Sequence, residues 1–206
     1  ATQQRGMTYL TKHKVLVVSM APFCRALGPP SRLNEAINYE KWKQSYDTDL
    51  PHLRFCAEIA LMQDEIGRFW MAETSWPTRL WELPGWSKVR ISKTTILKVV
   101  DQCRFGRRGP NGLLVKKTTL IATNATEIAE QFDDLRCNGR HKHDDMWGKP
   151  SKLLELQTWP WELAARIVQG IINLRRRLRS TQDRRQYAIM MDAYPCIGCD
   201  SGLPGH

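Results

Sequence analysis

Four side chains of the metal-binding type lie in two separate parts of this chain. Cys137, His141 and His143 fall within one polar loop that contains glycine, and Cys103 stands where an apolar run ends. Thiolate and imidazole together suit Zn²⁺, and an extended His-x-His segment presents both rings on one side. These four residues therefore predict a Cys2His2 zinc site. The spacing is not that of a zinc finger, so a solvated histidine-rich loop is the alternative.

Two further residues have types and positions that suit catalysis. Cys24 follows a short apolar run and has Arg25 and Arg32 nearby, which would stabilise a thiolate nucleophile. Glu73 follows the apolar residues 69–72, and a carboxylate at the end of a buried strand is well placed to bind a ligand. The alternatives are a buried structural cysteine and a solvated loop glutamate.

Basic residues gather on both sides of a glycine-containing turn, where a backbone can approach phosphates closely. The candidate nucleic-acid-binding residues of this group are Arg104, Arg107, Arg108, Lys116 and Lys117. A second basic group, at residues 175–185, is either a further contact surface or a solvated helix end favoured by the helix dipole.

The order of these motifs resembles that of cytosine-5 DNA methyltransferases. Ala21-Pro22-Phe23-Cys24 comes first, Glu73 follows after the next strand, and the basic block that ends at Asn124 comes last. The resemblance implies that Cys24 attacks the base and that Glu73 holds the flipped cytosine. In this family the S-adenosylmethionine site lies upstream of the nucleophile, so that cofactor is implied only if a missing N-terminal half is supplied.

Residues 101–172 also resemble a domain found in polyproteins of copia-like retroelements, in which motifs like Asp101-Gln102-Cys103 and Arg136-Cys137 recur. The leading hypothesis is therefore a nucleic-acid-binding, methyltransferase-like domain of a mobile element that lacks its own S-adenosylmethionine site. The alternatives are part of a true cytosine-5 DNA methyltransferase and a structural or assembly module of a polyprotein. The expected partners are nucleic acid, DNA before RNA, and other parts of the polyprotein.

Apolar patterning predicts the elements that must position these residues. Strands are expected at residues 14–20, 68–73, 95–100 and 113–122, the last two antiparallel. Helices are expected at 31–46, 49–66, 81–89, 124–135 and from Pro160 to 179. The helix at 124–135 is expected to begin with a capping box formed by Asn124 and Glu127. This alternation predicts an α/β fold with a mostly parallel, Rossmann-like sheet and a C-terminal helix. One domain is expected over residues 1–180, followed by a tail at 181–206 with a short strand at 187–191.

Composition limits the classes of binding partner and the cellular compartments that are expected for this chain. Hydrophobic residues make up 42% of the chain and charged residues 25%, which is typical of a globular domain. The formal net charge of +10 favours a polyanion, nucleic acid before membrane. No apolar run approaches the roughly 20 residues that a membrane span needs. The six cysteines are spread out except for Cys196 and Cys199, and the start of the chain is polar, which together indicate a reduced intracellular protein, nuclear or cytoplasmic.

Overall fold

A computed structural model describes residues 2–23, 25–144 and 157–193 of the chain. Along these residues the elements follow in the order α1 (Thr2–His13), β1 (Val17–Met20), α2 (Ser31–Ile37), α3 (Tyr39–Glu65), β2 (Phe69–Ser75), η1 (Leu80–Glu82), α4 (Pro84–Ile91), β3 (Ile96–Asp101), η2 (Gln102–Phe105), β4 (Thr118–Thr123), α5 (Thr126–Ala129), η3 (Glu130–Phe132) and α7 (Trp161–Ala193). The expected α/β class with a C-terminal helix is confirmed.

The sheet is mixed, which corrects the expectation of a mostly parallel one. Its strand order is β1-β2-β4-β3, and only β1 and β2 are parallel. β4 runs antiparallel to both β2 and β3. The reason lies in the connections: α2 and α3 form a crossover between β1 and β2, whereas residues 102–117 form a turn and loop that bring β4 straight back beside β3. The expected antiparallel pairing of the last two strands is confirmed.

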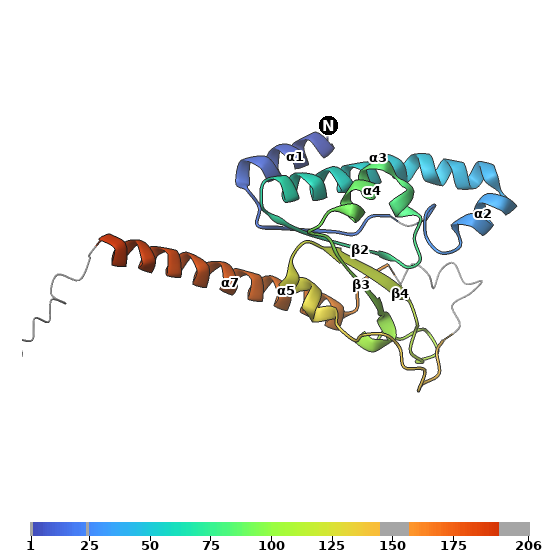
Figure 1. The fold of residues 1–206 in the computed structure, drawn as a ribbon. Helices are drawn as coiled ribbons and strands as arrows, with labels where there is room; N and C mark the ends of the chain where they lie inside the picture. The colour runs from blue at the N-terminus through green and yellow to red at the C-terminus, as the bar shows by residue number, and fades with distance from the viewer. Residues whose placement is uncertain (1, 24, 145–156, 194–206) are drawn as a thin grey trace, which may run out of the picture.

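Helices cover both faces of the sheet (Figure 1). On one face α1, α3 and α4 pack over Trp70 and Ala72, together with Leu53. On the other face α5 and α7 pack over Met71 and Ile121. Alternate residues of a strand point to opposite faces, so both sets of side chains in these central strands are apolar and buried.

The helices before β2 break at a different place from the one expected. The structure has a short α2 and then one continuous α3 over residues 39–65, where the sequence predicted a break near residue 48. Asn38 sets the actual break, because its side chain accepts a hydrogen bond of 3.0 Å from the Lys41 amide and so caps α3. Gly67 ends the segment as expected, with a φ of +65° that suits glycine.

Asn124 does not cap the helix that follows β4, and the expected capping box with Glu127 is wrong. α5 begins only at Thr126. The Asn124 side chain instead accepts a hydrogen bond from the Trp70 amide at 2.8 Å and donates to Asp64 at 2.7 Å. Asn124 therefore ties the end of β4 to the start of β2, and the competing tertiary partners determine its role.

The last helix is longer than the sequence predicted. α7 continues to Ala193, so residues 187–191 are helical and the expected strand there is wrong. The expected domain boundary at residue 180 falls inside this helix, and residues 194–206 lie outside the described part of the chain. α7 packs closely on α5 at Gly170, where an added Cβ would lie 2.7 Å from the Ile128 Cα. Its distal end extends past the sheet (Figure 1).

None of the helices in the described ranges is both long enough and apolar enough to span a bilayer.

Candidate metal centre

The structure brings the four predicted metal ligands together. Cys103 lies in η2, directly after β3, and the other three residues lie in the loop that follows η3. The potential ligand atoms of Cys103, Cys137, His141 and His143 all lie within 4.8 Å of one another.

The spacing within this cluster fits a tetrahedral ion. The Cys137 Sγ lies 3.7 Å from the His141 Nε2 and 3.4 Å from the His143 Nε2. Zinc–sulfur and zinc–nitrogen bonds of ordinary length, at tetrahedral angles, place sulfur and nitrogen about 3.6 Å apart. The cluster can therefore hold a metal ion with little rearrangement, and two thiols with two imidazoles form a donor set that zinc prefers.

The local environment raises the pKa of one potential ligand and lowers the pKa of another. Burial raises the pKa of the Cys103 thiol to about 11, and its hydrogen bond with Cys137 adds to this effect. Burial also lowers the pKa of His143, helped by the nearby His141 and Lys116, and so favours the neutral imidazole that a metal requires. A bound cation would reverse the effect on the thiols, because a coordinating thiol is deprotonated.

Asp101 holds in place the loop at residues 136–144, which carries Cys137, His141 and His143 and is called the metal loop below. It ends β3 with only 1% of its surface exposed. Its carboxylate accepts hydrogen bonds from the Cys137 amide at 2.8 Å, the Thr118 hydroxyl at 2.6 Å and the Arg136 guanidinium at 2.9 Å. Burial alone would raise the pKa of Asp101, but these three donors outweigh burial and lower it. The ionised Asp101 therefore positions the backbone of Cys137.

A second carboxylate, that of Asp144, joins the metal loop to the basic turn at residues 104–117. The Asp144 carboxylate accepts hydrogen bonds from the Asn111 amide at 3.0 Å and from the Asn111 side chain at 2.8 Å. The Asp144 amide donates to the Leu114 carbonyl at 2.7 Å, and Leu114 also pairs with His143 in a β-bridge. The two loops thus form one unit around the cluster.

The predicted phosphate-binding residues divide into two groups. Arg104 and Lys116 are exposed, and so is Arg108, although Arg108 also donates a hydrogen bond of 2.6 Å to the Gly112 carbonyl. Arg107 donates to the Thr158 carbonyl, and the ammonium of Lys117 lies 3.7 Å from Glu73 Oε1, so these two also serve internal contacts.

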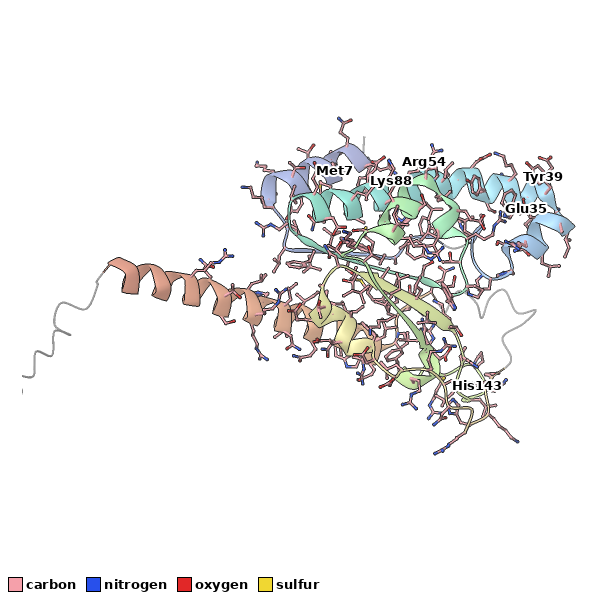
Figure 2. The ribbon with its side chains drawn as sticks, viewed as in Figure 1. Met7, Glu35, Tyr39, Arg54, Lys88 and His143 are labelled. Atoms are coloured by element: carbon pink, nitrogen blue, oxygen red, sulfur yellow. The ribbon has the colours of Figure 1, made fainter. Side chains whose placement is uncertain are left out.

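Sequence reasoning missed three cations of the metal loop itself. Arg136, Arg140 and Lys142 are exposed and are chain neighbours of the cysteine and histidine ligands. The alternation of ligands with cations in residues 136–143 is the sequence signal that indicates them. Figure 2 shows His143 among side chains tipped with nitrogen, at the end of the molecule remote from α1. The candidate metal centre therefore lies within a cationic surface.

Glu73, the predicted catalytic carboxylate, is buried with 6% of its surface exposed. Its Oε2 accepts a hydrogen bond of 3.0 Å from the Trp159 indole, whereas its Oε1 accepts none from any residue that the structure describes. The parallel register pairs Met20 with Ala72, so the chain leaves β1 and β2 at the same edge of the sheet. Cys24 lies outside the described residues, and its predicted role as nucleophile stays a prediction.

Comparisons with known proteins give this chain no family. No protein-family model, no curated protein and no solved structure matches it. What the chain does has to be inferred from its own residues.

Proposed function

We propose that this chain is a nucleic-acid-binding, methyltransferase-like domain of a mobile element, in which a zinc ion joins the loops that carry the basic residues. The observation that carries the proposal is the convergence of Cys103, Cys137, His141 and His143 on one point. In this proposal zinc cross-links loops that have no regular secondary structure. The metal has a structural role and not a catalytic one.

The cations around the metal centre supply the binding chemistry. Arg104 follows Cys103 in the chain, Arg140 and Lys142 flank His141, and Lys116 is close enough to His143 to influence its pKa. Contacts to phosphate neutralise charge and release counterions, which yields affinity without sequence preference. A loop that is already ordered by a metal loses less entropy on binding. DNA is the proposed polyanion, and the chain acts beside other parts of a polyprotein.

Binding to a labelled DNA duplex at several salt concentrations tests this proposal. The double variant Arg140→Ala/Lys142→Ala is expected to weaken binding and to reduce the slope of log affinity against log salt by about 0.9 for each phosphate that is no longer neutralised. The matched control is Arg54→Ala/Lys88→Ala, which removes the same charge from exposed positions on α3 and α4, remote from His143 in Figure 2. This control is expected to keep the slope.

An equal loss of affinity in both double variants would show that overall charge alone drives binding, and would contradict a dedicated surface. An unchanged affinity in Arg140→Ala/Lys142→Ala would remove the metal loop from the interface.

A second candidate function is part of a cytosine-5 DNA methyltransferase. It is favoured by the buried Glu73, whose Oε1 accepts no hydrogen bond among the described residues although it lies near the end of a central strand. In this alternative Cys24 attacks the base, Glu73 orients it, and a missing N-terminal half supplies the S-adenosylmethionine site.

This alternative predicts loss of methyl transfer in specific variants. In an enzyme reconstituted with its missing half, Cys24→Ser is expected to abolish transfer of labelled methyl groups to DNA. Glu73→Gln is expected to lower the rate by about 10²–10⁴-fold, the usual contribution of a positioned acid–base group. A rate that both variants leave intact would rule out this active site.

A further inference from the structure

α7 has an exposed apolar face in addition to the one that packs on the domain. Its inner face buries Leu163, Ile167 and Leu174 against the sheet and α5. Its outer face leaves Trp161 86% exposed and Val168 54% exposed. An exposed tryptophan in line with further apolar residues marks an interaction surface more often than a scattered surface residue does.

The residues of the outer face follow the heptad spacing of a coiled coil. Steps of four and three residues alternate along a single stripe that consists of Trp161, Ala165, Val168, Ile172, Arg175 and Arg179. This spacing is that of the a and d positions of paired helices. The first four residues of the stripe are apolar and the last two are cationic, and this asymmetry determines which partner fits.

We propose that α7 pairs with α7 of a second copy of this chain in antiparallel orientation. A parallel pair would place Arg175 against Arg175 and Arg179 against Arg179, which repel each other. An antiparallel pair places Val168 of one copy against Ile172 of the other at the centre of the seam.

The ends of an antiparallel seam are also complementary. Arg179 of each copy lies against Trp161 of the other, where a guanidinium can stack on the indole. Ala165 lies against Arg175 of the second copy, and its small side chain leaves room for the long arginine stem. The two arginines of the stripe on each copy thus meet the first two apolar residues of the stripe on the other copy.

The flanking positions favour the same orientation. Glu162, Gln169 and Arg176 each follow a d position and therefore occupy e positions, which set the partner and the orientation in coiled coils. All three are exposed. In the antiparallel register Glu162 of one copy faces Arg176 of the other, and Gln169 faces Gln169. Each chain thus presents a carboxylate where the second copy presents a guanidinium.

The shape of the molecule permits this pairing. α7 is 33 residues long, so it spans about 50 Å. It packs against α5, and its distal end extends past the sheet (Figure 1). The pairing rests on α7 alone and does not depend on the proposed zinc or nucleic-acid binding, although it would place two cationic surfaces in one particle.

Light scattering on the full chain tests the pairing. The wild-type chain is expected to show a mass twice the 23.8 kDa of one chain and to dissociate on dilution. Ile172→Glu is expected to reduce the mass to that of one chain while the circular dichroism spectrum stays the same, because Ile172 lies at the surface of the single chain with 37% of its surface exposed. The matched control is Ile91→Glu on α4, where the native side chain is 80% exposed, and this variant should remain dimeric.

Cysteine cross-linking tests the orientation. A mixture of Val168→Cys and Ile172→Cys chains is expected to form disulfide-linked dimers above the wild-type background, whereas neither variant does so alone. Cross-linking by each single variant would show a parallel pair and overturn the proposal. A wild-type chain that is monomeric at all concentrations, or an equal loss of dimer in Ile91→Glu and Ile172→Glu, would also overturn it.

Discussion

Purified with zinc in the medium, the chain is expected to carry one zinc ion, and Cys137→Ser is expected to lose it. The Cys137 sulfur lies 3.7 Å from the His141 Nε2 and 3.4 Å from the His143 Nε2, so its removal eliminates a donor that is next to both imidazoles. Elemental analysis by mass spectrometry measures the metal directly.

The same variant is expected to lose the stabilisation that zinc provides. A ligand that binds only the folded state stabilises it by about 2.7 kcal/mol when its free concentration is 100 times the dissociation constant. The free energy of unfolding of the wild-type chain should therefore rise with free zinc, whereas that of Cys137→Ser should not. Urea unfolding at several buffered zinc concentrations measures this difference.

Cys56 provides the matched control for the zinc experiment. It lies on the buried face of α3, with its Sγ 3.6 Å from the His52 Nε2, and burial raises the pKa of its thiol to about 12. Cys56→Ala should keep one zinc per chain, although it costs some packing. Zinc retained in Cys137→Ser, or zinc lost equally in Cys56→Ala, would place the metal elsewhere. A wild-type chain without zinc would remove the metal from the proposed function.

Asp101→Ala is expected to lower both the stability of the fold and the affinity for zinc. This change leaves the Cys137 amide and the Thr118 hydroxyl without their acceptor and leaves Arg136 without its partner. Loss of a buried, charged acceptor of this kind costs about 3 kcal/mol. Because Asp101 positions a metal-binding residue, zinc affinity should also fall by about 10–100-fold.

Asp133→Ala is the control for Asp101→Ala. Asp133 pairs with Lys98 at the surface, with half of its side chain exposed, and such pairs contribute at most about 1 kcal/mol. Asp101→Asn keeps the shape and one acceptor, so its effect should lie between the two. Competition with a zinc chelator measures affinity, and urea unfolding measures stability. Equal stability of Asp101→Ala and Asp133→Ala would show that the metal loop does not depend on Asp101.

Local patterns were sufficient to place most of the strands and several helices. The run before Cys103 predicted β3 within one residue, because its length and its β-branched residues favour a strand over a helix. The direction of the pairing was beyond local patterns. Whether β4 lies beside β3 alone or between β2 and β3 depends on contacts between distant segments, and those contacts produced the mixed sheet.

The candidate site also has one part that the sequence predicts and another part that only the fold determines. Residue type, together with the polar loop and the strand end on which the residues lie, predicted Cys103, Cys137, His141 and His143 as one set of ligands. The role of Asp101 was not predictable, because its three donors come from positions 118, 136 and 137, which only the fold brings to it. Asn124 shows the same limit, since its tertiary partners replaced the expected cap.

The sequence by itself determined the chemical content of this protein: the zinc-type ligands, the cationic balance, and the apolar periodicities that make strands and helices. These properties depend only on residue type and on spacing within a segment. Only the tertiary structure decided the sheet order, the hydrogen bonds that hold Cys137 over Asp101, and the separation of the inner and outer faces of α7. Those outcomes depend on which distant segments pack together, because burial and the pairing of polar groups are properties of the whole fold.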